Sequence, residues 1–258
     1  MSILSGKRVL VTGAGRGIGR AIANICADEG ANVAICSRTK IELEETMAEL
    51  EATQSSNMGM YVVDLKEQEQ VDSMVSSIVE SFGGIDILIN NAGRGQAGKG
   101  PAHELATSDL KDLLDLNIVS VHSVTASVLQ KSMLKNGSGR IINISSKAGK
   151  VGIPNMAFYC ASKFAVEGYS ATIAEELKDK NIIVNTISPG MVDTSSFPKA
   201  KGKKGVRTAE SVKDGLLLLL TTDKTGHYVH VDELDEVKEK GLDDEMALKP
   251  INEAPFSA

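Results

Sequence analysis

The sequence has 258 residues, 42% of them apolar, and its 28 lysines and arginines stand against 34 acids for a formal net charge of −6. These values predict one folded α/β domain, because such folds often reach ~250 residues as a single unit. They disfavour a nucleic-acid binder, which needs clustered cations and stacking aromatics. Apolar runs such as residues 216–220 fall far short of the ~20 residues that cross a bilayer, so we expect no membrane span.

Signals for secretion and for metal binding are weak. Lys7 and Arg8 follow the start of the chain at once, so we expect no secretory leader and a cytoplasmic location. The three cysteines, at positions 26, 36 and 160, lack the spacing of a disulfide framework or a zinc site. His227 and His230 are three apart on an expected strand and face opposite sides of it, so we predict no metal site.

Between residues 7 and 231, taken in chain order, short β-branched runs alternate with segments of helical period. Strands are predicted at 8–11, 32–36, 58–63, 85–89, 140–144, 182–186 and 227–231. Helices are predicted at 18–29, 40–53, 67–82, 107–135, 156–179 and 209–220. The alternation predicts a single α/β domain, a doubly wound parallel sheet of about seven strands with helices on both faces. Architecture alone leaves a nucleotide-free α/β fold open.

A glycine-rich turn joins the first expected strand to the first expected helix. Residues 12–19 read TGAGRGIG and contain Gly13, Gly15, Arg16, Gly17, Ile18 and Gly19. Glycines let a backbone approach a pyrophosphate, and the free N–H groups at a helix start bind it. The turn therefore predicts a Rossmann-type dinucleotide site, with a purely structural turn as the alternative.

The end of the second expected strand indicates which dinucleotide is bound. Ser37 and Arg38 stand where an acid would bind a free ribose 2′-hydroxyl, and Arg16 adds a second cation nearby. A guanidinium donates two parallel hydrogen bonds to a phosphate, so the pattern predicts NADP(H). Arg38 could also be a solvated loop cation. Asp64, followed by Leu65, could accept a hydrogen bond from the adenine amino group or cap the next helix.

Tyr159 and Lys163 form a candidate catalytic pair. They are four residues apart on an expected helix, so the phenol and the ammonium lie on one face. A phenol of pKa ~10 is a poor acid or base at neutral pH, and a neighbouring cation favours its phenolate. Ser146 lies thirteen residues before Tyr159, and its hydroxyl could hold a carbonyl oxygen beside the phenol. Considered alone, such a pair also occurs on exposed helix faces.

Several motifs stand in one order along the chain: TGAGRGIG at 12–19, NNAG at 90–93, Ser146, the YxxxK of residues 159–163, and SPG at 188–190. In this order and spacing the chain resembles the short-chain dehydrogenase/reductases, and more narrowly their compact single-domain branch, over about residues 6–231. The resemblance implies an NADP-preferring oxidoreductase. Residues 1–231 would form the NADP-binding and catalytic domain, and residues 232–258 an acidic C-terminal extension.

The resemblance also implies a role for each catalytic residue. Tyr159 would protonate a carbonyl oxygen as general acid, and Ser146 would orient and polarise that carbonyl. Lys163 would bind the nicotinamide ribose and lower the pKa of Tyr159, and Asn117 would hold a water that links Lys163 to solvent. Further cofactor contacts are implied for Asn90, Ala92, Gly93, Pro189, Gly190, Val192 and Thr194.

The function implied is an NADPH-dependent reductase of a ketone or aldehyde, reversible as alcohol oxidation, with a small-molecule substrate. Two alternatives remain: a 3-oxoacyl thioester reductase acting on acyl carriers, and a dinucleotide-sensing protein without turnover. Ile153, Met156 and Met191 suggest an apolar pocket or ordinary core packing. The basic stretch from Lys199 to Arg207 could attract an acyl carrier or form a solvated lid.

The acidic extension bears on assembly. The family usually has Asp-Gly-Gly after the seventh strand, where subunits pack, whereas this chain continues from Val231 and Asp232 into Glu233. We expect a homodimer, through the helices that contain Asn117 and Tyr159, or a homotetramer. Between residues 232 and 245, eight acids against two lysines account for the whole net charge. This segment is expected to be a solvated, partly disordered end or a cover over an assembly surface.

Overall fold

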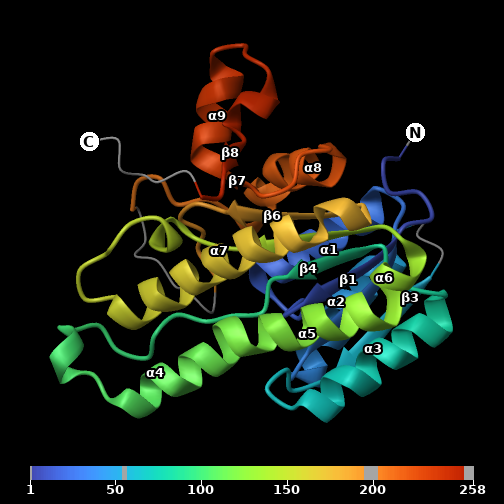
Figure 1. Ribbon diagram of the computed structural model, residues 1–258, viewed down its shortest axis with the longest axis horizontal. Helices are drawn as coiled ribbons and strands as arrows, with labels where there is room; N and C mark the ends of the chain where they lie inside the picture. Colours follow the sequence, from blue (N-terminus) through green and yellow to red (C-terminus); the bar gives the residue numbers. More distant parts are fainter. Residues whose placement is uncertain (1, 54–56, 195–202, 253–258) are drawn as a thin grey trace.

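The structure, a computed structural model, describes residues 2–53, 57–194 and 203–252 (Figure 1). Its centre is one sheet in the strand order β3-β2-β1-β4-β5-β6-β7-β8. The strands are β1 (Arg8–Thr12), β2 (Asn32–Ser37), β3 (Met58–Val62), β4 (Ile87–Asn90), β5 (Gly139–Ile144), β6 (Ile182–Ser188), β7 (His227–His230) and β8 (Lys249–Pro250). Strands β1 to β7 are parallel, and β8 is antiparallel to β7. The predicted parallel sheet is confirmed, with a short eighth strand that the sequence did not indicate.

Helices cover both faces of this sheet. They are α1 (Gly17–Asp28), α2 (Lys40–Glu51), α3 (Gln68–Phe82), α4 (Thr107–Leu114), α5 (Ser120–Val128), α6 (Leu134–Asn136), α7 (Ala157–Leu177), α8 (Lys213–Thr221) and α9 (Val231–Glu239). No helix in the described ranges has both the length and the apolar composition needed to cross a membrane. The predicted helices are all present, and α9 is additional.

Buried strand residues alternate between two hydrophobic cores. On β1, Val9 and Val11 belong to the core that α1, α2, α8 and α9 share, whereas Leu10 belongs to the core under α3, α5 and α7. The strands read as nearly continuous apolar runs because both of their faces are covered.

The sheet reverses its strand order between β1 and β4. Strand β1 pairs with β2 on one side and with β4 on the other, so the loops that follow β1 and β4 lead away in opposite directions. In open α/β sheets, ligands bind in the crevice that this divergence leaves at the carboxyl ends of the strands. The predicted site residues should therefore gather there.

The long helix predicted over residues 107–135 contains two π-helical turns. The turns span Asp115–Val119 and Leu129–Met133 and join α4, α5 and α6 into one continuous helical segment. A π turn takes in one extra residue and often marks a functional site. The first turn contains Asn117, so the irregularity falls at a predicted catalytic residue.

The acidic segment is folded as far as residue 252. Helix α9 begins at Val231, a 3-10 turn follows at Asp244–Ala247, and β8 pairs with β7. Leu234 and Leu248 belong to the core beneath α1. The possibility of a disordered end therefore does not hold for residues 232–252, because periodic apolar side chains anchor them. Residues 253–258 lie outside the described part of the chain.

Candidate active site

The glycine-rich loop follows β1 and opens α1 at the crevice. Gly13 has a φ of +66°, and a Cβ placed on it would lie 2.8 Å from the Cα of Ala92. A Cβ on Gly19 would lie 2.3 Å from the carbonyl oxygen of Gly13. Any larger residue would force this turn open, so the loop backbone stays bare beside the amino end of α1, as an approaching phosphate requires.

The loop after β4 is fastened to the glycine loop. The Thr12 hydroxyl oxygen accepts from the backbone N–H groups of Asn91, at 3.0 Å, and Ala92, at 3.1 Å. The Asn91 side chain donates to the carbonyls of Thr12, at 2.9 Å, and Gly13, at 3.1 Å. Neither Thr12 nor Asn91 was among the predicted site residues, although both stand inside the motifs that indicated the site.

The loop after β6 reaches the same place. Gly190 has a φ of +74°, and the Thr194 side chain lies 3.1 Å from the position that a Cβ on Gly17 would take. The glycine cradle, Ala92 and Thr194 therefore face one crevice, and these residues fit a dinucleotide. Pro189 and Val192 are buried there, and Ile18 and Gly93 are half-buried.

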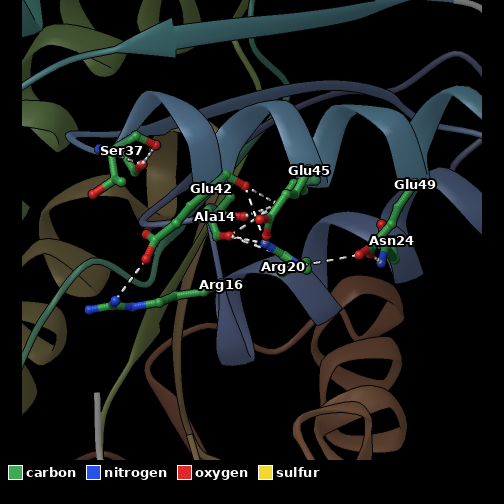
Figure 2. Close-up of polar contacts among 11 residues, drawn as sticks. Ala14, Arg16, Arg20, Asn24, Ser37, Glu42, Glu45 and Glu49 are labelled. Atoms are coloured by element: carbon green, nitrogen blue, oxygen red, sulfur yellow. Dashed lines mark hydrogen bonds and ion pairs between the residues drawn. The ribbon is translucent and has the colours of Figure 1, made fainter. Parts of the chain in front are cut away.

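Ser37 and Glu42 lie against Gly15. Figure 2 shows Arg16 reaching the side chain of Glu42. An Arg16 Nη atom lies 2.8 Å from a Glu42 carboxylate oxygen. A Cβ on Gly15 would lie 3.0 Å from the Ser37 hydroxyl oxygen and 3.0 Å from the Glu42 Cβ. The structure brings Arg16 to Glu42, a residue that the sequence did not single out, because the approach of Glu42 depends on how α2 packs.

Arg38 and Asp64, predicted at the same end of the site, lie near each other with a nitrogen–oxygen distance of 3.9 Å. Asp64 also accepts from the backbone N–H of Lys66 and does not cap α3, which begins at Gln68. Leu65 is buried in the core under α3.

Asn90 ends β4 with its side chain inside the protein. Its side chain donates to the Thr125 hydroxyl at 2.9 Å and to the Asn143 side-chain oxygen at 2.8 Å, and it is buried. The side chain therefore joins β4 to β5 and α5 within the protein. The predicted cofactor contact of Asn90 stays a prediction.

Tyr159 and Ser146 meet at the carboxyl end of β5. Burial raises the pKa of the Tyr159 phenol to about 12, and a hydrogen bond with the Ser146 hydroxyl offsets part of that rise. Ser146 also accepts from the backbone N–H of Ala148 at 3.1 Å, which fixes its side chain. The phenol is therefore protonated at neutral pH and is held beside a second hydroxyl.

Lys163 lies behind the phenol, with its Nζ 6.0 Å from the centre of the Tyr159 ring. It donates to the Ile144 carbonyl at 2.8 Å, and burial lowers its pKa to about 8, against the opposing charge of Glu167. The expectation that Lys163 lowers the pKa of Tyr159 stays a prediction. Burial is the largest influence on the pKa of the Tyr159 phenol, and the Lys163 ammonium donates to the Ile144 carbonyl.

Glu167 is a further residue that the sequence did not single out. It follows Lys163 by four residues on α7, is buried, and pairs with Lys150 Nζ at 3.1 Å. The Thr186 hydroxyl donates to it at 3.0 Å. Its spacing from Tyr159 and Lys163 was the available signal.

Asn117 links the crevice to α7. Its side-chain oxygen accepts from the Arg94 N–H at 3.0 Å, and its amide donates to the Arg94 carbonyl at 2.9 Å and to the Ser162 hydroxyl at 3.1 Å. The residue holds the loop after β4 against the helix of Tyr159. The predicted water-holding role of Asn117 stays a prediction.

The segment around Arg207 is tied to the loop after β6. The backbone of Arg207 bonds to Met191 and Asp193, and its guanidinium pairs with Asp232 at 2.7 Å and Asp235 at 2.5 Å. Acids of α9 thereby hold this segment beside the predicted carboxamide site. Lys199 and Lys201 of the basic stretch lie outside the described residues.

An apolar wall stands next to the phenol. Ala148, Tyr159 and Cys160 form a small buried cluster, and Ile153 and Met156 pack against it. These contacts are compatible with both alternatives, an apolar pocket and ordinary core packing.

The glycine loop fits a dinucleotide, and the buried Tyr159 phenol bonds to Ser146 at the same carboxyl ends of the strands. This is the arrangement of an oxidoreductase. The family model described as short chain dehydrogenase matches residues 7–204. The chain belongs to the short-chain dehydrogenase/reductase family.

Named relatives differ in substrate and cofactor. The chain is 32% identical over 214 residues to the 3-oxoacyl-[acyl-carrier-protein] reductase FabG of Vibrio cholerae, which covers 83% of this chain and 85% of that protein. It is similar to the solved actinorhodin polyketide ketoreductase with NADPH, with a TM-score of 0.79, 30% identity, and coverage of 88% and 98%. It is also similar to carveol dehydrogenase from Mycobacterium avium in complex with NAD, with a TM-score of 0.82, 25% identity, and coverage of 90% and 98%.

Proposed function

We propose that the protein is an NADPH-dependent reductase of a ketone or aldehyde carbonyl, reversible as alcohol oxidation. The observation that carries the proposal is the buried Tyr159 phenol, hydrogen-bonded to Ser146 beside the glycine cradle. When bound, NADP(H) would supply or accept the hydride. Carbonyl, NADPH and one proton then give alcohol and NADP⁺.

The chain's own residues would handle the proton and the carbonyl. Because its pKa is raised, Tyr159 holds its proton at neutral pH and can donate it to the carbonyl oxygen that gains charge. Ser146 would hold that oxygen next to the phenol, and its own position is fixed by the Ala148 N–H. Lys163, when charged, would favour the phenolate that proton donation leaves behind.

The choice of NADP(H) over NAD(H) is supported by the two cations at the ribose end of the site. Arg38 follows Ser37 at the end of β2, Arg16 lies in the glycine loop, and the strand end itself has no acid. The side chains of Arg16 and Arg38 are 50% and 58% exposed. Arg16 pairs with Glu42 and Arg38 with Asp64, and a phosphate could displace either carboxylate. A 2′-phosphate would gain charge-assisted hydrogen bonds from them.

The test is a panel of ketones and aldehydes assayed by NADPH oxidation, with NADH run in parallel. We expect turnover with NADPH and a lower kcat/KM with NADH. A preference for NADH would contradict the cofactor assignment. Tight NADPH binding without turnover on any carbonyl would favour the dinucleotide-sensing alternative.

A 3-oxoacyl thioester reductase is a second candidate, favoured by the likeness to the 3-oxoacyl-[acyl-carrier-protein] reductase of Vibrio cholerae. Lys203 and Lys204 are exposed and lie shortly before Arg207 in the chain. Their charges could bind an acidic carrier protein. Rates on a carrier-bound 3-oxoacyl group and on a simple ketone of similar length separate the two candidates.

We further propose a homodimer through the helical segment of Asn117 and through α7. Val119 and Phe164 are large apolar residues on these elements, and their exposed fractions are 49% and 43%. Apolar side chains of this size on neighbouring helices suit a subunit interface. Sedimentation of the wild-type chain and of a Phe164→Glu variant tests this assembly.

A further inference from the structure

Glu42 places a negative charge at the point where the cofactor's 2′-phosphate would bind. It lies in the first turn of α2, and one of its carboxylate oxygens is 3.3 Å from the position of a Cβ on Gly15. The Ser37 hydroxyl is 3.0 Å from that same position. Glu42, Ser37 and the glycine loop therefore share one small volume (Figure 2).

The carboxylate of Glu42 is paired with Arg16, the cation that the glycine loop contributes. The two groups are 2.8 Å apart, and their side chains are 23% and 50% exposed respectively. Both are accessible enough to exchange partners. The carboxylate that neutralises Arg16 in the free protein is therefore in a position to compete with an incoming phosphate.

A second arginine nearby is committed elsewhere. Arg20 donates to the Gly15 carbonyl at 2.6 Å and pairs with Glu45 at 2.8 Å and Glu49 at 3.2 Å. Figure 2 shows Arg20 between α1 and α2, where it also donates to the backbone carbonyl of Glu42 at 3.2 Å, whereas Arg16 pairs with the Glu42 carboxylate. Arg20 thus fastens the two helices and is not free to replace Arg16 at a phosphate.

We propose that Glu42 is a specificity-determining residue that limits the preference for NADPH over NADH. This inference rests on the proposed function. A 2′-phosphate must open the Arg16–Glu42 pair and then remain close to the released carboxylate. A 2′-hydroxyl carries no charge, so NADH binds without opening the pair.

The size of the effect follows from the exposure of the pair. Exposed ion pairs are individually weak, and solvent screens the remaining repulsion between carboxylate and phosphate, so Glu42 should reduce affinity for a 2′-phosphate by about five- to tenfold. Affinity for a cofactor without this phosphate should change by less than about twofold, because its charges lie farther from Glu42.

Calorimetric titration of the full chain with adenosine 2′,5′-bisphosphate and with 5′-AMP isolates this phosphate without any turnover, and NADPH and NADH are titrated in parallel. Glu42→Gln keeps the side-chain shape and removes the charge. We expect it to tighten the bisphosphate and NADPH by about five- to tenfold and to leave 5′-AMP and NADH within about twofold. Glu45→Gln, which removes the partner of Arg20 on the same helix, is the matched control and should change neither ratio.

A double variant shows whether the effect passes through Arg16. In an Arg16→Gln background, Glu42→Gln should give at most half of its gain, because no cation is left to release. Equal changes for both cofactors, no change, or weaker bisphosphate binding by Glu42→Gln would overturn the inference. A wild-type preference for NADH, with the ratio still shifted by Glu42→Gln, would overturn only the proposed NADPH dependence. Failure of every variant to bind either cofactor would overturn both proposals.

Discussion

Replacing Arg207 with alanine should loosen the segment that is tied to the loop after β6. The guanidinium holds Asp232 at 2.7 Å and Asp235 at 2.5 Å, and the Arg207 backbone bonds to Met191 and Asp193. The side chain is therefore the link between α9 and the predicted carboxamide-binding loop. Its loss leaves the backbone contacts without support from α9.

The magnitude follows from the geometry and exposure of the two pairs. The Arg207 side chain is 23% exposed, but Asp232 and Asp235 are 52% and 41% exposed, so solvent screens both pairs. We assign about 0.35–0.7 kcal/mol to each pair and about 0.7–1.4 kcal/mol to both. If the docked segment is needed to bind the cofactor, this loss weakens NADPH binding by up to about tenfold.

Fluorescence or calorimetric titration with NADPH measures this loss directly. Arg207→Ala should weaken binding about three- to tenfold, whereas Asp235→Asn, which removes one of the two pairs, should give about half the change in free energy. Arg207→Lys keeps the charge but loses the planar guanidinium that reaches both carboxylates, so its loss of NADPH affinity should lie between those of the other two variants. A Kd for Arg207→Ala within twofold of wild type, in a folded protein, would refute the reasoning.

Two further predictions concern stability. Burial, the largest single influence, would raise the pKa of Asp86, but the hydrogen bonds and the charge of Arg8 lower it overall. The pair therefore stabilises the fold above pH ~4, and this contribution is lost as the pH falls below that value. Asp86→Asn should therefore cost about 1–2 kcal/mol at pH 7 and much less at pH 3 in urea titrations, and an equal cost at both pH values would contradict this. Leu234 is fully buried in the core under α1, so Leu234→Ala should cost about 2–4 kcal/mol in the same assay, and an unchanged midpoint would show that α9 does not stabilise the fold.

The local features of the nucleotide site could be predicted because they depend on short-range backbone geometry. Gly13 and Gly19 stand where a Cβ would collide with neighbouring backbone. The glycines in the sequence therefore indicate that the backbone segments of this loop pack closely. Strands β1, β2 and β4 were equally predictable, since burial on both faces makes them runs of mostly apolar residues, whereas the short, exposed β8 was not.

Features that depend on packing between elements were not predictable. Glu42 reads as an ordinary exposed acid on a polar helix, and only the docking of α2 against α1 brings it to Arg16. The pKa of Tyr159 depends on burial of the phenol and on its hydrogen bond with Ser146, and spacing along α7 does not determine how deeply the phenol is buried.

The acidic segment shows how composition can hide structure. Its many carboxylates indicated solvation, yet Leu234 and Leu248 belong to the core. Several of the acids are paired with cations of the body, as Asp232 and Asp235 are with Arg207. The net charge of this segment reflects its exposed side chains and does not indicate that its leucines are buried.

The central claim, that Tyr159 donates the proton in an NADPH-dependent carbonyl reduction, is tested most directly by comparing Tyr159→Phe with Tyr169→Phe. Both phenols lie on α7 and burial raises the pKa of each to about 12, but Tyr169 contacts His122, away from Ser146. On a carbonyl that the wild type reduces, Tyr159→Phe should bind NADPH normally and lose at least ~100-fold in kcat, while Tyr169→Phe stays near wild type. Wild-type turnover by Tyr159→Phe would contradict the account.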